Sequence, residues 1–155
     1  MKESERTWDR WKRRLAVIGA LLAMSGPGGA VGGEVDAPMA LRGVMRELGE
    51  QMQAVTDGIS REDYEVIERS ARAIADHRQP PLDEKARIIA YFGGRMSQFK
   101  RLDDELKRSA TELGAAAGRR DGQGAIDAFQ WLQSNCYACH REFRGDFVRQ
   151  FYGAP

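Results

Sequence analysis

The two cysteines of this 155-residue chain lie three residues apart near its C-terminal end, in the segment Cys136-Tyr137-Ala138-Cys139-His140. On a helix, residues three apart lie on nearly the same face, one turn removed. Two thiols so placed can add to the two vinyl groups along one edge of a porphyrin. The next residue then carries an imidazole under the ring, where it can bind the iron. The C-x-x-C-H pattern therefore predicts one covalently attached haem c, with Cys136 and Cys139 as attachment sites and His140 as an iron ligand.

Other uses of the cysteine pair stay open at this stage. A disulfide redox pair has the same spacing, although it usually stands at a helix N-terminus in a βαβ fold, and a disulfide across one helical turn would be strained. A structural zinc site needs four ligands, and the chain offers the two cysteines, His140 and the distant His77. The third alternative is a buried, unreactive pair in a haem-free structural bundle. The histidine that follows the second cysteine favours haem.

The segment 1–33 has the layout of a secretory signal peptide. It contains the basic residues Arg13 and Arg14, a short apolar run from Leu15 to Met24, and an exit rich in glycine and alanine. An uncleaved membrane anchor is the alternative, but the run is shorter than the roughly 18 apolar residues of a spanning helix. We therefore expect a signal peptide over 1–33, a mature domain over 34–155 without a membrane span, and a periplasmic location, where haem c is attached.

The mature part of the chain shows helical periodicity and no convincing strand pattern. Apolar residues at spacings of three and four predict four helices, at about 41–59, 64–74, 95–117 and 125–149. Ser60 with Asp63 resembles a capping box that would start the second helix. After two prolines, Asp83 is expected to cap a shorter helical segment that ends near Phe92. Four helices with mostly short loops favour an all-α fold, an antiparallel four-helix bundle.

Composition and charge narrow the possible functions. The chain is 42% hydrophobic and 30% charged, as is ordinary for a globular protein, and its formal net charge of +1 gives no indication of nucleic-acid binding. The sequence shows no general base, no nucleophile pair and no cluster shaped for a substrate. We therefore expect a protein that is not an enzyme.

Two motifs resemble those of a known family, the class II c-type cytochromes or cytochrome c′ family. "MRELGEQM" at 45–52 is similar to the family's first-helix segment, and "CYACHREFR" at 136–144 is similar to its C-terminal haem motif. The similarity of pattern covers about 38–150. It implies a left-twisted antiparallel bundle with one haem between the helices near one end, thioether bonds at Cys136 and Cys139, and His140 as the proximal iron ligand.

The resemblance places Met45 on the distal side of the iron, and the family divides at this position. Members with a ligating methionine are six-coordinate and carry electrons, whereas members with an uncoordinated residue are five-coordinate and bind nitric oxide or carbon monoxide. We expect ligation by Met45 and one-electron transfer, with gas binding as the alternative function. Met45 could also be a core residue, as a methionine at helical spacing commonly is. Met52 and His77 are the other candidate ligands, and we expect His77 to lie on the surface near a helix C-terminus.

Two further expectations come from the resemblance. Family members often carry an arginine at the position of Leu41, where it meets a haem propionate; here Arg42 is one step away and is our candidate, with Arg46 and Arg144 as weaker ones. Family members are often homodimers through the first two helices, and exposed apolar residues such as Val44 and Val66 would fit a homodimer. The sequence does not identify the redox partner protein.

Overall fold

The computed structural model describes residues 39–153, and every regular element in this range is helical. Four helices form the bundle, and two further helices lie at its base. Their bounds are Ala40–Ser60 for α2, Tyr64–Ala75 for α3, Leu82–Phe92 for α4, Met96–Gly118 for α5, Gly122–Cys139 for α6 and Gly145–Tyr152 for α7. A 3₁₀ turn, Gly93–Arg95, leads into α5, and a π-helical segment, His140–Arg144, joins α6 to α7.

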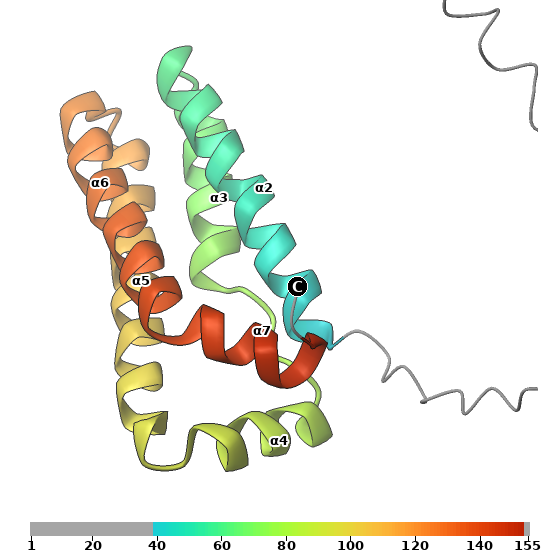
Figure 1. The fold of residues 1–155 in the computed structure, drawn as a ribbon. Helices are drawn as coiled ribbons and strands as arrows, with labels where there is room; N and C mark the ends of the chain where they lie inside the picture. The colour runs from blue at the N-terminus through green and yellow to red at the C-terminus, as the bar shows by residue number, and fades with distance from the viewer. Residues whose placement is uncertain (1–38, 154–155) are drawn as a thin grey trace, which may run out of the picture. The chain divides into compact units, whose positions relative to one another are not determined.

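The bundle helices α2, α3, α5 and α6 run antiparallel to their neighbours in chain order, while α4 and α7 lie across the base of the bundle (Figure 1). The predicted all-α, four-helix architecture is therefore confirmed. Among residues 39–153, no helix is long and apolar enough to cross a membrane. The predicted signal peptide at 1–33 lies outside the described residues, so the boundary at residue 34 stays a prediction.

Two turns of the same design connect α2 to α3 and α5 to α6. Each passes through one residue with a left-handed φ of 55°, Glu62 in the first turn and Arg120 in the second. An aspartate follows directly and caps the next helix. The side chains of Asp63 and Asp121 accept hydrogen bonds from backbone N–H groups three residues on, at 3.1 and 2.9 Å. These short turns keep each helix pair antiparallel and adjacent.

Two expected helix caps are wrong. Ser60 is the last residue of α2, and its hydroxyl donates to the Thr56 carbonyl at 2.9 Å, so Asp63 alone caps α3. Asp83 lies inside the first turn of α4, while Pro81 stands at the N-cap position and makes no side-chain cap. An acidic residue in the first turn still interacts favourably with the positive end of the helix dipole. This preference explains why Asp83 resembles a helix cap in the sequence.

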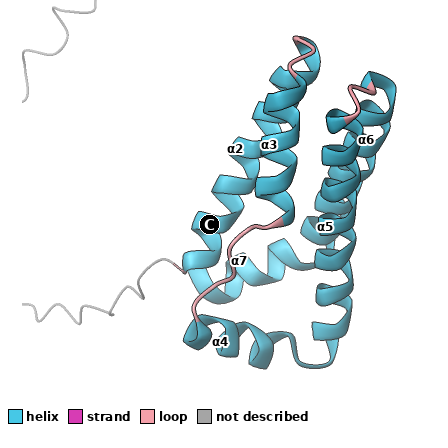
Figure 2. Ribbon diagram, turned by 180° about the vertical axis from the view of Figure 1, so that it is seen from behind, coloured by secondary structure: helices cyan, strands magenta, loops and turns pink. Residues whose placement is uncertain are grey.

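The fourth helix is not the single straight element expected over 125–149. It is helical throughout, but a π-helical segment follows Cys139, and α7 then leaves the direction of α6 and crosses above α4 (Figures 1 and 2). The apolar spacing continues through the break, so the sequence pattern alone did not reveal it. The turn places the aromatic face of α7 against α4, with Phe147 buried in the contact.

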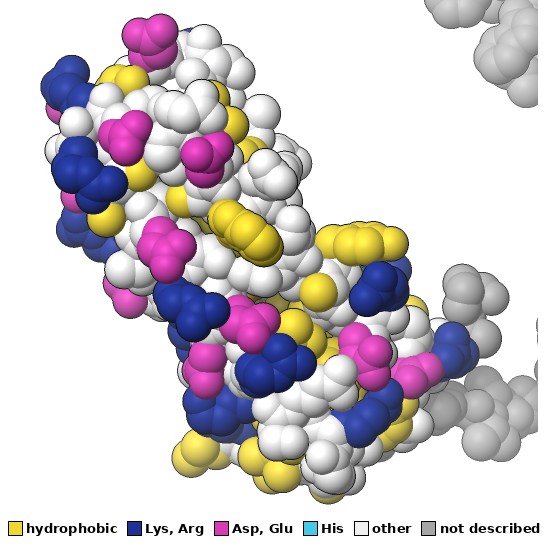
Figure 3. Space-filling view, turned by 90° about the vertical axis from the view of Figure 1, so that its left-hand side faces the viewer, with side chains coloured by type: hydrophobic (Ala, Val, Ile, Leu, Met, Phe, Trp, Pro, Cys, Tyr) yellow, Lys and Arg dark blue, Asp and Glu magenta, His cyan; other side chains and the backbone are white. Residues whose placement is uncertain are grey.

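The interior consists of two clusters. An aliphatic cluster fills the bundle between the two turns, and an aromatic cluster fills the base around α4 and α7. Val44, which we expected to be exposed for a dimer contact, is only 2% exposed, and Val66 is partly buried, so the expectation is wrong for Val44. Charged side chains of both signs are interspersed over the face that Figure 3 shows. On α5, three ion pairs join residues four apart.

Candidate functional site

A cavity lies between α2 on one side and α5, α6 and α7 on the other. It has two lobes of about 330 and 350 Å³, each within the usual range for small-molecule and cofactor sites, roughly 300–1,000 Å³. The basal lobe is walled by aromatic residues of the base, and the upper lobe by residues of the bundle. Four residues line both lobes and so lie where they meet: Met45, Phe99, Cys139 and His140.

Both predicted attachment sites reach this cavity. Cys136 and Cys139 are free thiols on the last turn of α6, each partly buried, and both line the upper lobe. Burial raises the pKa of both thiols, and the pKa of Cys139 reaches about 11 through burial and the nearby Cys136 and Asp103. Catalytic C-x-x-C pairs instead have a thiol whose pKa is lowered. The environment of the pair therefore gives no support to a redox disulfide.

Cys136 is held in place by a polar contact next to it. The amide of Asn135 donates to the Ser109 hydroxyl at 2.7 Å and to the Glu105 carbonyl at 3.3 Å. Because Ser109 is buried on α5, this contact fixes the register between α5 and α6 immediately before the first cysteine. The two thiols are thus presented from a part of α6 that cannot slide along its neighbour without losing hydrogen bonds.

His140 begins the π-helical segment and lines both lobes. Desolvation lowers the pKa of its imidazole, and the positive charge of Arg144 lowers it further. The neutral imidazole, the form that binds metals, is thereby favoured. Single π-helical turns inside α-helices are frequent at functional sites, and here the turn starts at the predicted iron ligand.

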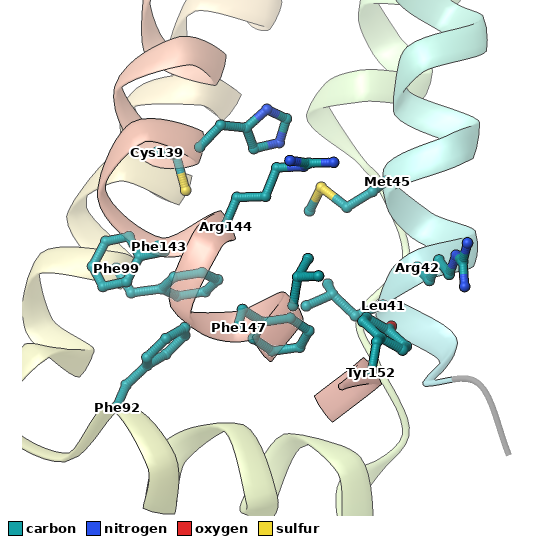
Figure 4. Close-up of a pocket in the computed structure, with 12 residues that line it drawn as sticks. Leu41, Arg42, Met45, Phe92, Phe99, Cys139, Phe143, Arg144, Phe147 and Tyr152 are labelled. Carbon is teal, nitrogen blue, oxygen red and sulfur yellow. The ribbon is translucent and has the colours of Figure 1, made fainter. Parts of the chain in front are cut away.

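Met45 projects from α2 into the cavity, and Figure 4 shows its side chain pointing toward Cys139 and Arg144. Met45 is 39% exposed. Met52, the other candidate methionine, lines only the upper lobe. Arg144 also points into the cavity, while Arg42 turns toward Tyr152, with its guanidinium carbon 5.4 Å from the ring centre (Figure 4). The propionate role of Arg42 stays a prediction.

The expectation that His77 lies on the surface is wrong. Its side chain is only 10% exposed and lines the upper lobe. The ring nitrogen Nδ1 lies 2.9 Å from the Ile74 carbonyl, and Nε2 lies 3.3 Å from a carboxylate oxygen of Asp103. Because both ring nitrogens already have partners, the geometry gives no support to His77 as an iron ligand.

Asp103 is a residue of the site that the sequence interpretation missed. Burial alone would raise its pKa, but hydrogen bonds from His77 and Lys107, together with their charges, outweigh burial and lower the pKa to about 2. The Lys107 ammonium lies 2.7 Å from the carboxylate. The sequence did indicate that Asp103 faces the interior, because it stands four residues after Phe99, on the apolar face of its helix.

Glu84 is a second missed residue, at the basal end of the site. It is 7% exposed, and its carboxylate accepts hydrogen bonds from the N–H groups of Ala40 and Leu41 at 2.6 and 2.7 Å. Glu84 precedes the buried Ile88 by four residues, so its place on the apolar face of α4 could be read from the spacing.

The donor set fits a covalently attached haem. Two free thiols and an imidazole reach one cavity from the end of α6, a thioether sulfur faces them from α2, and the basal wall consists of phenylalanine rings. Among the described residues, no three histidine, cysteine, aspartate or glutamate side chains gather in a way that could hold a metal ion by themselves. A porphyrin supplies four ligands to its own iron, so the single imidazole of His140 at this cavity suits iron held in that form.

Comparison with known proteins identifies a protein family. A protein-family model described as "Cytochrome C'" matches residues 39–144. No curated protein matches the chain, and no solved structure matches it.

Proposed function

The chain belongs to the cytochrome c′ family, a family of c-type haem cytochromes, and on that premise we propose that it carries single electrons through one covalent haem c. Cys136 and Cys139 would hold the haem, and His140 and Met45 would bind its iron from opposite sides. The iron supplies a one-electron couple when the haem is bound. The proposal assigns the chain no catalytic step.

The position of Met45 carries this proposal. Of the candidate distal ligands, only Met45 lines both lobes of the cavity together with His140, and it does so from the opposite helix. Met52 lines one lobe, and the ring nitrogens of His77 are already engaged. A thioether opposite an imidazole is a common ligand pair in electron-transfer cytochromes, where it raises the reduction potential.

The apolar walls of the site would also raise the reduction potential. Phe92, Phe143 and Phe147 are buried and give the basal lobe an apolar wall. An apolar shell disfavours the extra positive charge of the oxidised state and so raises the potential. The chain's contribution would thus be to orient two ligands and to surround the haem with apolar side chains.

Gas binding is the second candidate function, and one observation favours it. A third cavity of about 70 Å³ adjoins Met45 between α2, α4 and α5, more than twice the roughly 30 Å³ that one water molecule occupies in the liquid. If Met45 moved into this space without binding iron, a diatomic molecule would have room on the distal side. Nitric oxide or carbon monoxide would then be the ligand.

Substitution of Met45 separates the two functions. In the haem-loaded wild-type protein we expect a low-spin ferric spectrum with the weak long-wavelength band of methionine ligation, and slow binding of carbon monoxide to the reduced protein. Met45→Ala should abolish that band, give a high-spin spectrum and allow rapid carbon monoxide binding, because the iron loses its sixth ligand. The measurement is optical spectroscopy with stopped-flow mixing.

Met52→Ala is the matched control, because it removes the same kind of side chain from the same helix and should leave the spectrum unchanged. A wild-type protein that is already high-spin and binds carbon monoxide readily would refute ligation by Met45 and leave gas binding as the function. If Met52→Ala rather than Met45→Ala changed the spectrum, the distal ligand would be reassigned.

We further propose that the protein works in the periplasm. The family relationship and the signal-peptide pattern at 1–33 support this location. Mass spectrometry of the exported protein tests both points, because we expect cleavage near residues 30–33 and the added mass of one haem. A mature chain that retains its first 33 residues would refute the signal peptide.

A further inference from the structure

Glu84 has an unusual position for a carboxylate. It is buried on α4, yet its two oxygens bind the first backbone N–H groups of α2, 44 and 43 residues away in the chain, at 2.6 and 2.7 Å. Such short hydrogen bonds from N–H to an ionised carboxylate are about twice as strong as neutral ones. A buried charge persists only when it is paired or hydrogen-bonded, and here the N-terminus of α2 supplies the compensation.

The beginning of α2 depends on this contact because its own sequence provides no cap. Met39 stands at the N-cap position and makes no side-chain hydrogen bond, and the first turn holds no acidic residue. The first N–H groups of a helix lack intrahelical partners, and the helix dipole favours a negative charge beside them. Glu84 meets both needs from a different helix.

The same helix α4 also contacts the opposite side of the cavity. The Tyr91 hydroxyl donates to the Asp146 carbonyl of α7 at 3.2 Å, and Phe92 packs on Phe143, with ring centres 4.9 Å apart. Figure 2 shows α4 lying beneath the bundle, with α2 above one part of it and the start of α5 at its other end. α4 therefore links α2, which carries Met45, to the segment that follows His140.

Met45 is one of the exposed large apolar residues of the described chain. It lies five residues after Ala40 on α2 and is 39% exposed. Packing of its own side chain therefore constrains Met45 weakly, so its position depends on how α2 is held, and the N-terminal end of α2 is held by Glu84.

From these contacts we infer that Glu84 is a positioning residue: by capping α2 from α4, its carboxylate holds Met45 at the cavity opposite His140. This inference rests on the proposed haem site. It predicts that loss of the carboxylate displaces Met45 even where the bundle stays folded.

The test compares Glu84→Gln with Asp83→Asn in the haem-loaded protein. Both substitutions remove one negative charge from the first turn of α4, but Asp83 is exposed. With methyl-labelled methionine, the Met45 methyl resonance should lie far from its usual position in the wild-type protein because of the adjacent haem. Glu84→Gln should move it back toward that position, and Asp83→Asn should not. Carbon monoxide binding should become about tenfold faster in Glu84→Gln alone, the factor that corresponds to loss of one hydrogen bond to a charged group.

Glu84→Asp keeps the charge on a shorter side chain and should shift the same resonance less; it also serves as the test variant should Glu84→Gln not fold. An unchanged Met45 resonance in every folded Glu84 variant, with lower resistance to urea, would overturn the inference and leave Glu84 a purely structural cap. The methyl shift reports the distance to the haem whether or not Met45 binds iron. A high-spin wild-type protein would therefore refute Met45 ligation without deciding the role of Glu84, which the resonance decides separately.

Discussion

At the scale of single residues, His77 and Asp103 form a partly buried polar contact beside the cavity. The hydrogen bond that the His77 ring donates to the Asp103 carboxylate is the largest effect on His77 and raises the pKa of its imidazole, although burial acts in the opposite direction. The raised pKa of His77 and the lowered pKa of Asp103 describe one shared interaction, with Lys107 as a third partner. The pair joins the end of α3 to α5 at the wall of the upper lobe.

This interaction makes the stability of the bundle depend on pH. Because the folded pKa of His77 is raised above 6.5, its stabilisation is complete below pH 6.5 and is lost as the pH rises through the folded value. The pKa of Asp103 falls from 3.8 to about 2, so its stabilisation is present above pH 3.8 and is lost as the pH falls through about 2. The contribution of the pair to the free energy of unfolding should therefore be greatest between pH 3.8 and pH 6.5.

We predict that His77→Gln lowers the free energy of unfolding by about 1.5–3 kcal/mol below pH 6.5, the usual value of a hydrogen bond to a charged group. The loss should shrink well above that pH, because the wild-type imidazole is then neutral. Urea unfolding over a pH series gives the measurement, and Asp103→Asn should remove most of the same pH dependence. Parallel pH profiles for wild type and His77→Gln would contradict the assignment.

At the scale of the elements, α2 packs tightly against the start of α3 at Gly58, which is buried. A Cβ atom built at Gly58 would lie 2.9 Å from a side-chain carbon of Ile67, on the first turns of α3, and 3.3 Å from the Asp63 carbonyl. The absence of a side chain thus permits the tight turn that keeps the two helices together. The aspartate cap and the glycine contact act on the same turn.

Gly58→Ala should therefore destabilise the protein by about 1–3 kcal/mol, the usual cost of overpacking. Gly114→Ala is the matched control, because it adds the same methyl group within α5 at an ordinary 3.6 Å from the Ala71 Cβ atom. The control should stabilise the protein by about 0.5–1 kcal/mol through helix propensity. Thermal and urea unfolding of both variants provide the comparison, and equal effects of the two substitutions would show that close packing at Gly58 does not matter.

At the scale of the whole molecule, the two interior clusters differ in how they relate to the cavity. The buried residues of the aliphatic cluster lie between α2, α3, α5 and α6, and only its partly buried neighbours Leu48, Met52 and Leu106 line the upper lobe. The aromatic cluster forms the basal wall of the cavity and includes Cys139 among its packed neighbours. A haem attached in the cavity would add apolar contact mainly to the aromatic cluster.

This difference predicts where haem attachment stabilises the structure. In hydrogen exchange, the amides of α4 and α7 should lose the most protection in the haem-free double variant Cys136→Ala/Cys139→Ala, relative to the haem-loaded protein. Amides of α3 and the N-terminal half of α6 should lose the least, because they belong to the aliphatic cluster. A uniform loss of protection over all the described helices would show that the bundle folds as one unit and would contradict the distinction.

Much of the fold could be predicted from the sequence. The 3.6-residue periodicity predicted both ends of α2, α3 and α5 and the start of α6 within a few residues, since each helix buries one stripe of its own surface. The break after Cys139 could not be predicted, because the apolar spacing passes through it. The π-helical turn and the change of direction depend on α4 being available for Phe147 and its neighbours.

The same division holds for the site. The sequence by itself determined the chemistry of the last helix, because two thiols three residues apart with a following imidazole are a local pattern that any helix presents on one face. Only the tertiary structure decided which side chains meet that pattern: Met45 from α2, the His77–Asp103 pair on its wall and Glu84 beneath it. These contacts join residues 26 or more positions apart, so they depend on how the helices pack, and burial then decides which polar groups must pair.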